Sequence, residues 1–383
     1  MIKQSERLNS VEEYYFSKKL REVSNMIQSG ESVINMAIGS PDLFPSIKVV
    51  DEIKNSLSDS FAHKYQSYQG LPELRDAIAK FYNKFFGVEL NPSNEVLPLM
   101  GSKEGIMHIS LAFLNPGDEV LIPNPGYPTY LSVTKLVEAN PVFYNLSKEN
   151  GWFPNLSELE NKDLSKVKLM WINYPHMPTG ASANFDQFEK LLEFAKTNNI
   201  LLINDNPYSF ILNDEYLSLL KVKGYKDFVL ELNSLSKSFN MSGWRVGMLV
   251  GSSDNITKVL KVKSNMDSGM FYGIQKGAIA ALNLDKSWFE DLNKVYLKRR
   301  KLIWNIADKL NCSYDKNSKG LFVWAKLPNH IKSSEQYIDT LLKEKKIFIA
   351  PGTIFGSNGE GYIRFSLCID EVKIYEALKR IEL

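Results

Sequence analysis

The chain has 383 residues, which is long enough for two domains with separate hydrophobic cores. Hydrophobic residues make up 44% of the sequence and charged residues 23%, as in an ordinary globular protein. Because 46 basic residues nearly balance 44 acidic ones, the net charge is +2 and no basic tail favours a nucleic acid or an anionic membrane surface as a partner.

The N-terminal part of the chain predicts a helix, a short strand and a second helix. Apolar residues at helical spacing indicate the first helix over residues 11–29. Residues 33–38 then read as a strand that runs into Gly39-Ser-Pro-Asp, and residues 47–57 read as a helix. Taken alone, this Gly-x-Pro-Asp sequence indicates only a turn.

Two tyrosines precede a glycine in the next segment. Tyr65 lies five residues before Gly70 and Tyr68 lies two residues before it, and Leu-x-x-Leu-Arg follows. From the residues alone, the segment is a loop that leads into the start of a helix.

Residues 97–130 hold a second dense group of glycines, prolines and polar residues. Gly101, Ser102 and Lys103 open a predicted helix that continues to residue 113. The unpaired N–H groups at such a helix start form a phosphate site, although a Gly-Ser start is more often only a cap. A strand over residues 119–122 follows, and then Tyr127 within Pro-Asn-Pro-Gly-Tyr-Pro-Thr-Tyr.

The middle of the chain alternates strands with a helix. Residues 168–173 and 200–205 read as buried strands, and residues 185–198 between them read as a helix. This alternation predicts a mostly parallel sheet covered by helices. Ligands of such sheets bind beyond the carboxyl ends of the strands, where Asp205 lies.

Lys237 lies on a predicted polar loop between strands at residues 228–232 and 248–250. Ser234, Ser236 and Ser238 flank it, and Arg245 follows eight residues later. An amine among hydroxyls and a guanidinium suits a cofactor that carries both an aldehyde and a phosphate. The alternative is a solvated serine-rich turn with an ordinary surface lysine.

The last hundred residues have a different character. A long amphipathic helix over residues 287–310 is followed by a strand (321–325), a helix (334–343) and a strand (347–350). Arg364 then lies in Gly-Tyr-Ile-Arg-Phe-Ser. A lone strand arginine is most often a surface ion-pair partner, but a guanidinium can also bind a carboxylate through two parallel hydrogen bonds.

Residues 234–247 resemble the Ser-x-Ser-Lys-x-Phe-x-x-x-Gly-x-Arg-x-Gly signature of the class I/II aminotransferases, which are enzymes of pyridoxal 5'-phosphate (PLP) with fold type I. Other motifs of the family occur in the expected order along nearly the whole chain. The resemblance implies an α/β fold, with a mostly parallel central sheet between helices and a smaller α+β domain built from the chain ends. We expect an N-terminal arm and part of the small domain in residues 1–45, a large PLP-binding domain in 46–283, and a small C-terminal domain in 284–383.

The resemblance also implies roles for individual residues. Lys237 would form the Schiff base with PLP and then act as general base, and Asp205 would pair with the protonated pyridine nitrogen. Tyr208, in Asp-Asn-Pro-Tyr, would hydrogen-bond the phenolic oxygen of PLP, and Tyr127 would stack on its ring. The catalytic set is therefore Lys237, Asp205 and Tyr208.

The remaining expected site residues bind the cofactor or the substrate. The family position of Tyr65 reaches the PLP phosphate of the neighbouring subunit, so we expect a homodimer with composite active sites. Gly39 and Arg364 would bind the α-carboxylate of the substrate, and no metal is expected. Residues expected on the phosphate or elsewhere along the cofactor are Gly101, Ser102, Lys103, Asn173, Ser234, Ser236 and Arg245. Lys103 could instead contact a distal substrate carboxylate or be a solvated lysine.

The sequence departs from the family at Met177. The family element is Asn-x-Pro-x-Asn-Pro-Thr-Gly, whereas this chain has Asn173-Tyr-Pro-His-Met177-Pro-Thr-Gly. A thioether cannot donate the hydrogen bond that the second asparagine gives to the phenolic oxygen of PLP. Our hypothesis is that the Lys237 Schiff base therefore keeps its proton to a higher pH.

The implied reaction is ping-pong transfer of an amino group between an L-amino acid and a 2-oxo acid. The helix-start and Tyr127 motifs look like the branch that contains LL-diaminopimelate, alanine and broad aspartate/aromatic/methionine aminotransferases. One alternative is a PLP-dependent carbon–sulfur β-lyase, and another is a non-catalytic PLP-binding domain. Absence of an appended basic DNA-binding module argues against the latter.

The sequence also bears on the compartment. Cys312 and Cys368 form no disulfide framework, and the N-terminus lacks the apolar stretch of a signal peptide. No apolar run approaches the ~18 residues that span a bilayer. We therefore expect a cytoplasmic enzyme.

Overall fold

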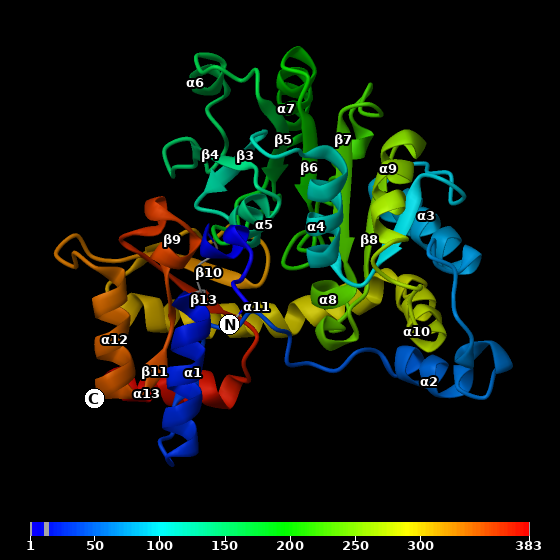
Figure 1. Ribbon diagram of the computed structural model, residues 1–383. Helices are drawn as coiled ribbons and strands as arrows, with labels where there is room; N and C mark the ends of the chain where they lie inside the picture. Colours follow the sequence, from blue (N-terminus) through cyan, green and yellow to red (C-terminus); the bar gives the residue numbers. More distant parts are fainter. Residues whose placement is uncertain (1, 11–14, 383) are drawn as a thin grey trace.

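A seven-stranded sheet forms the centre of the molecule. The computed structural model describes residues 2–10 and 15–382. The strand order is β2-β8-β7-β6-β5-β3-β4, and all neighbouring pairs among β3 to β7 are parallel, whereas β8 runs antiparallel to both β2 and β7 (Figure 1). The strands are β2 (Val96–Leu99), β3 (Glu119–Asn124), β4 (Asn140–Asn145), β5 (Val167–Ile172), β6 (Leu201–Asp205), β7 (Val229–Ser234) and β8 (Gly247–Gly251).

Helices cover both faces of this sheet. Successive residues of a strand point to opposite faces, so Leu169 and Trp171 of β5 enter one core whereas Met170 and Ile172 enter another. The first core contains α4 (Ser102–Phe113), α5 (Thr129–Leu136) and α9 (Ser253–Lys263). The second contains α3 (Pro72–Phe86), α7 (Phe185–Thr197) and α10 (Tyr272–Leu282), with α2 (Ile47–Ser56) packed on α10; the short α6 spans Leu156–Glu160.

The two ends of the chain lie together beside the large sheet. Figure 1 shows α1 (Tyr15–Gln28) close to α12 (Ser334–Lys345) and α13 (Glu371–Glu382). β1 (Ile34–Asn35) pairs in parallel with β11 (Ile347–Phe348), and the four-stranded sheet β12-β13-β10-β9 is antiparallel. Its strands are β9 (Ser313–Tyr314), β10 (Phe322–Lys326), β12 (Ala350–Pro351) and β13 (Tyr362–Ser366).

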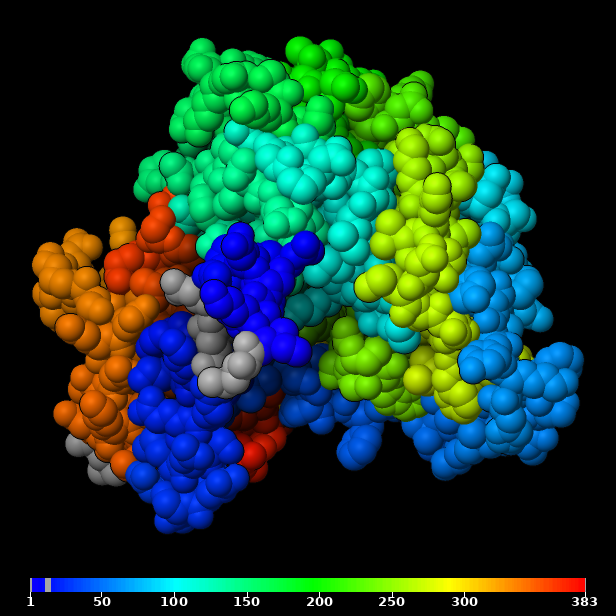
Figure 2. All heavy atoms as spheres, viewed as in Figure 1, coloured from blue at the N-terminus to red at the C-terminus, as the bar shows by residue number. Residues whose placement is uncertain are grey.

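A third core belongs to this smaller part. It joins buried residues of α1, of α11 (Lys286–Lys309) and of the C-terminal strands and helices. Figure 2 shows the blue N-terminal segment lying where the green and the orange parts of the molecule meet. This core also includes Met177, Tyr208 and Ile211 from the middle of the chain, and the domain boundaries that we place at residues 45/46 and 283/284 stay a prediction.

The fold class predicted from the sequence is confirmed, with local corrections. Lys237 lies on the short helix α8 (Leu235–Ser238), not on a loop, because the Ser234 side chain accepts the N–H of Ser236 and caps that helix. The strand expected at 347–350 divides between two sheets, and Pro351, which has no N–H to donate, lies on the edge strand β12. The predicted start of the first helix at residues 11–14 lies outside the described residues.

Short 3-10 turns connect these elements. They are η1 (Glu6–Ser10), η2 (Ser60–His63), η3 (Leu219–Lys221), η4 (Ser242–Trp244), η5 (Gly352–Phe355) and η6 (Ser357–Gly359). None of the described helices is long and apolar enough to cross a bilayer.

Candidate active site

A cavity of about 170 Å³ lies at the carboxyl ends of the parallel strands. Met177, Pro207 and Ser242 line it together with ten of the residues that the sequence predicts for the site. Those ten are Ser102, Lys103, Tyr127, Asn173, Asp205, Tyr208, Ser234, Ser236, Lys237 and Arg245.

Lys237 is a buried amine in this cavity. It follows β7 on α8, and its Nζ donates a hydrogen bond to the carbonyl oxygen of Gly39 at 2.5 Å. Burial lowers the pKa of Lys237, and the positive charges of Arg364 and Arg245 lower it further. A larger share of neutral amine follows, and neutral amine is the form that attacks an aldehyde.

Asp205 ends β6 and carries one unsatisfied oxygen. The Tyr130 hydroxyl donates a hydrogen bond to Oδ2 at 2.9 Å, whereas Oδ1 is buried without a partner in the described residues. Burial raises the pKa of Asp205 to about 6, against the lowering effects of Tyr130 and Lys237. An orphaned buried acceptor of this kind fits a protonated ring nitrogen.

The N-terminus of α4 and the Ser234–Arg245 segment form an anion cup. Gly101, at φ +88°, caps α4, and a β-carbon placed there would lie 2.2 Å from Nη2 of Arg245. Ser234 Oγ donates to Ser236 Oγ at 2.8 Å, and Arg245 Nη1 lies 3.5 Å from Ser236 Oγ. Hydroxyls, a guanidinium and free helix N–H groups therefore converge, as phosphate binding requires.

The aromatic and amide side chains of the cavity are held firmly. Burial raises the pKa of both the Tyr127 and Tyr208 phenols, so they remain neutral hydrogen-bond donors. The Asn173 side chain donates to the Asp205 carbonyl and accepts the backbone N–H of Met177 at 2.7 Å. It thereby ties the β5 end to the β6 end.

Arg364 lies between two phenyl rings at the edge of the cavity. Its guanidinium carbon is 3.9 Å from the Phe322 ring centroid and 4.6 Å from that of Phe355. Nη2 donates to the Ala37 carbonyl at 2.8 Å, and Nη1 contacts the Met177 sulfur at 3.4 Å. The rings fix the plane of the guanidinium, which favours two parallel hydrogen bonds to a carboxylate.

Four predicted residues do not line the cavity, namely Gly39, Gly101, Tyr65 and Arg364, and Lys103 lies at its rim. Lys103 is exposed on the first turn of α4. Tyr65 is 92% exposed and does not line the cavity, and Tyr68 is 46% exposed.

The sequence reasoning assigned no role to three further residues. Tyr130 is fully buried, stacks on Trp171 and holds Asp205. Ser242 lines the cavity, and Cys368 is close enough to Lys237 for each to affect the pKa of the other. Tyr130 lies three residues after Tyr127 in a motif already singled out, on the first turn of α5.

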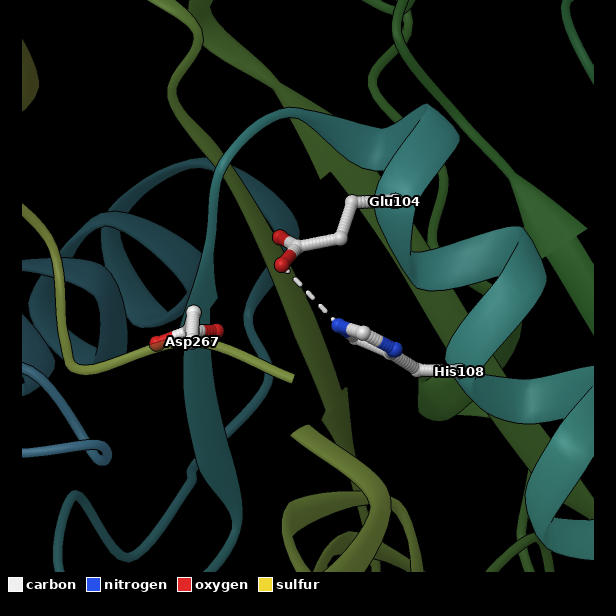
Figure 3. A group of neighbouring side chains, drawn as sticks. All are labelled: Glu104, His108 and Asp267. Atoms are coloured by element: carbon white, nitrogen blue, oxygen red, sulfur yellow. Dashed lines mark hydrogen bonds and ion pairs between the residues drawn. The ribbon is translucent and has the colours of Figure 1, made fainter. Parts of the chain in front are cut away.

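A second polar group lies beside the anion cup. Figure 3 shows Glu104 and His108 of α4 facing Asp267 of a neighbouring loop, and their ligand atoms lie within 4.8 Å of one another. His108 Nε2 is 2.9 Å from Glu104, and Lys263 Nζ donates to both oxygens of Asp267 at 2.7 and 2.9 Å. Because this ammonium already occupies Asp267, we assign no metal here.

The chain matches the family model "Aminotransferase class I and II" over residues 31–381. It is 38% identical to the LL-diaminopimelate aminotransferase of Aquifex aeolicus over 384 residues, covering 100% of this chain and 99% of the relative. It is 39% identical to the enzyme of the same name from Dehalococcoides mccartyi over 382 residues, covering 99% and 98%.

Solved structures of aminotransferases and related proteins also match the whole chain. Substrate-bound BacF of Bacillus subtilis superposes with a TM-score of 0.95 at 34% identity, covering 100% of this chain and 98% of that one. An aminotransferase from Staphylococcus aureus has a TM-score of 0.90 at 32% identity, with 99% of each chain covered. Thermus thermophilus aspartate aminotransferase with maleate, at 23% identity and a TM-score of 0.92, shares the fold; its match covers 99% of each chain.

These matches favour amino-group transfer over carbon–sulfur elimination, and they imply PLP as cofactor. The residues present fit that cofactor, because the cavity holds a buried amine, an orphaned carboxylate oxygen and an anion cup. The chain is thus a PLP-dependent enzyme that belongs to the class I and II aminotransferases.

Proposed function

We propose that Lys237 is the reactive amine of this aminotransferase, with Asp205 and Tyr208 as its partners, and that its amino donor is LL-diaminopimelate. One observation carries the site assignment: a buried lysine of lowered pKa shares a small cavity with the Asp205 carboxylate, whose Oδ1 has no hydrogen-bond partner among residues 2–10 and 15–382. Perturbed ionisable groups that meet in a cleft are typical of catalytic sites.

Bound PLP supplies an electron-accepting ring and an aldehyde carbon to which an amino group can be attached. Asp205 Oδ1 would accept a hydrogen bond from the protonated ring nitrogen, and Tyr127 would stack on the ring. The Tyr208 hydroxyl would donate a hydrogen bond to the phenolic oxygen. These three side chains would thus hold the ring.

The phosphate is held by the anion cup. Ser102, the free N–H groups of α4, Ser234, Ser236 and Arg245 would hold it. Gly101 leaves room for the Arg245 guanidinium, and Lys103 adds a positive charge at the rim. Charge-assisted hydrogen bonds of this kind are about twice as strong as neutral ones.

Arg364 orients the substrate. Its guanidinium binds the α-carboxylate, and the Gly39 carbonyl, which accepts Lys237 Nζ in this structure, places that segment beside the reacting amine. The α-carbon proton then lies within reach of Nζ. Lys237 takes up this proton and gives it back, and its lowered pKa increases the share of neutral amine that can take up a proton.

The names of the relatives support the donor. Both full-length relatives at 38–39% identity carry the name LL-diaminopimelate aminotransferase. A donor with a charged far end would meet Lys103, which is exposed at the rim of the cavity and forms no ion pair among the described residues. We further propose 2-oxoglutarate as the amino acceptor.

Dimerisation and the compartment belong to the same proposal. Tyr65, Phe44 and Phe61 are large, strongly exposed side chains of one N-terminal stretch. We propose that a second copy covers it, that Tyr65 reaches the partner's anion cup, and that the homodimer works in the cytoplasm.

A donor panel tests the substrate. PLP-loaded protein is incubated with 2-oxoglutarate and one amino acid at a time, and glutamate is measured. We expect LL-diaminopimelate to give the highest kcat/KM, at least about tenfold above aspartate, alanine, methionine and phenylalanine. A higher value for any of these four would contradict the proposed donor. The assignment of Lys237 is tested separately, because Lys237→Ala should lose activity with every donor.

A further inference from the structure

A second cavity, of about 530 Å³, lies between the large sheet's part of the molecule and the small antiparallel sheet. One side is formed by Lys148, Trp152 and the stretch 179–182, and the other by β9, β10 and Tyr362. We refer to it as the interdomain cavity. It shares no lining residue with the active-site cavity.

The interdomain cavity lies next to the substrate arginine along the same sheet face. Trp324 pairs with Arg364 across β10 and β13, and Lys326 pairs with Tyr362. Paired residues of an antiparallel ladder share a face, and so do residues two apart on a strand. Trp324, Tyr362 and Lys326 therefore continue the face that carries Arg364, away from the cofactor residues.

Aromatic rings form the wall of this cavity. Trp324 and Tyr362 stack with centroids 5.0 Å apart and planes 6° apart, and Trp152 meets Tyr362 edge-on at 5.6 Å. Trp152 and Tyr362 are only partly buried. A flat π surface that remains partly open suits a planar ring.

Cations surround these rings. Lys148, Lys319 and Lys326 line the cavity, and among the described residues none of their ammonium groups forms an ion pair. Asp315 also lines the cavity, and Glu149 lies close enough to Lys148 and Lys326 for their positive charges to lower its pKa. Three unpaired lysines against two carboxylates leave an excess of positive charge, which attracts an anion.

The back wall is continuous with the active site. Residues 179–182 are separated from Met177 only by Pro178, and the Gly180 carbonyl accepts the backbone N–H of Lys319 at 2.7 Å. Thr179 Oγ1 lies 2.8 Å from His176 Nδ1. A molecule in the interdomain cavity would therefore touch both parts of the chain whose relative position sets the distance from Arg364 to Lys237.

We propose that the interdomain cavity is a second ligand site, which binds a planar aromatic anion distinct from the amino acid and 2-oxo acid substrates. The ring stacks on Trp152 and therefore meets Tyr362 edge-on, because the planes of these two side chains are 75° apart, and the anionic group lies between Lys148 and Lys326. A nucleotide and an aromatic carboxylate share this chemistry. The two sources differ in the charge that they bring to the lysines.

Calorimetric titration of the PLP-loaded protein tests the proposal. The probes are adenosine 5'-monophosphate and indole-3-carboxylate, each at matched ionic strength, with ribose 5-phosphate as the anion that lacks an aromatic ring. We expect at least one aromatic probe to bind and ribose 5-phosphate to bind at least about tenfold more weakly, because it cannot stack. Binding of the phosphate probe alone identifies a nucleotide-like ligand, and binding of the carboxylate alone identifies the other source.

Variants locate the binding. In Lys148→Gln/Lys326→Gln we expect the affinity to fall at least about tenfold through loss of two favourable charges. Trp152→Leu should weaken it separately. Lys332→Gln, which changes an exposed lysine that does not line the cavity, should bind like wild type.

The results that overturn the site are equally specific. They are an absence of binding by both aromatic probes, equal binding of ribose 5-phosphate, an affinity unchanged in the double lysine variant, or full competition with the amino donor. Transaminase activity is measured on the same samples, so a failure of the proposed function is visible independently of the interdomain cavity.

Discussion

Burial acts in opposite directions on the two ionisable groups at the centre of the site. It raises the pKa of Asp205 to about 6 and lowers the pKa of Lys237, so both groups are shifted toward their neutral forms. Ionised Asp205 is thus destabilised until a proton-bearing group meets Oδ1. In the proposed function the PLP ring nitrogen is such a group, and it would satisfy this acceptor.

This predicts a pH dependence for the PLP-free protein. The pKa of Asp205 is about 6 in the folded protein and has an ordinary value of 3.8 in the unfolded chain. Between these two pH values, the folded state therefore binds more protons than the unfolded state. Stability is therefore lost as the pH rises from about 4 to about 6, by up to roughly 3 kcal/mol. Asp205→Asn cannot ionise and should lack this loss.

Thermal unfolding of both PLP-free proteins between pH 4 and pH 7 measures the difference. Asp205→Asn should gain stability relative to wild type as the pH rises, yet should bind PLP more weakly because an amide cannot pair with the ring nitrogen as an anion does. A stability difference that is the same at pH 4 and pH 7 would contradict the assignment.

Met177 gives a second prediction at this scale. Asparagine at this position could donate a hydrogen bond to the phenolic oxygen of PLP, whereas the thioether cannot. In PLP-loaded Met177→Asn, we expect the pKa of the Lys237 Schiff base to be lower than in wild type, by on the order of one unit. This pKa is read from the visible absorption as the pH is varied.

Met177→Leu is the matched control, because leucine has a similar volume and also lacks an amide. Its pKa should equal that of wild type. Equal values for all three proteins would show that this side chain does not act on the cofactor.

At the scale of elements, the anion cup depends on the start of α4. Gly101 has φ +88°, and a β-carbon there would collide with the Arg245 guanidinium. Gly101→Ala should therefore displace Arg245 and weaken PLP binding by at least about tenfold, in addition to a backbone cost of roughly 1–3 kcal/mol, because φ +88° with ψ 154° is a conformation that only glycine adopts readily.

Gly151→Ala separates the two effects. Gly151 also has a positive φ, +62°, but a β-carbon there would meet no atom within 4 Å. It should reduce stability by a similar backbone cost while PLP affinity, measured by fluorescence titration, stays unchanged. If both variants bind PLP equally well, Gly101 is not part of the cup.

Elements also show what the sequence could and could not predict. Strand β6 and helix α4 have clear hydrophobic periodicity and clear boundary residues, and their bounds were predicted closely. Helix α10 was not predicted, because its apolar residues form no single stripe. It packs on α2 through Gly277, where a β-carbon would lie 2.9 Å from Ile53. Tyr130 was missed because its partner Asp205 lies 75 residues away, and only the fold brings them together.

On the scale of the whole molecule, the exposed side chain of Tyr65 bears on whether the protein forms a dimer. The tyrosine is 92% exposed in the single chain although its motif predicts a phosphate contact. If a partner subunit receives it, Tyr65→Phe should weaken PLP binding several-fold through loss of one hydrogen bond to a charged group.

Tyr68→Phe is the control, because Tyr68 lies three residues away on the same exposed segment. It should bind PLP like wild type, and sedimentation should show a dimer for all three proteins. A monomer, or equal PLP affinity in both variants, would contradict the composite site.

The measurement that tests the central claim most directly is a single half-reaction. PLP-loaded protein is mixed with LL-diaminopimelate without any 2-oxo acid, and the cofactor is then released and identified. Transfer at Lys237 predicts that PLP becomes pyridoxamine 5'-phosphate, one equivalent per site, and that no free ammonia appears. Lys237→Ala should form no pyridoxamine 5'-phosphate. Unchanged PLP with release of ammonia would contradict amino transfer and favour elimination.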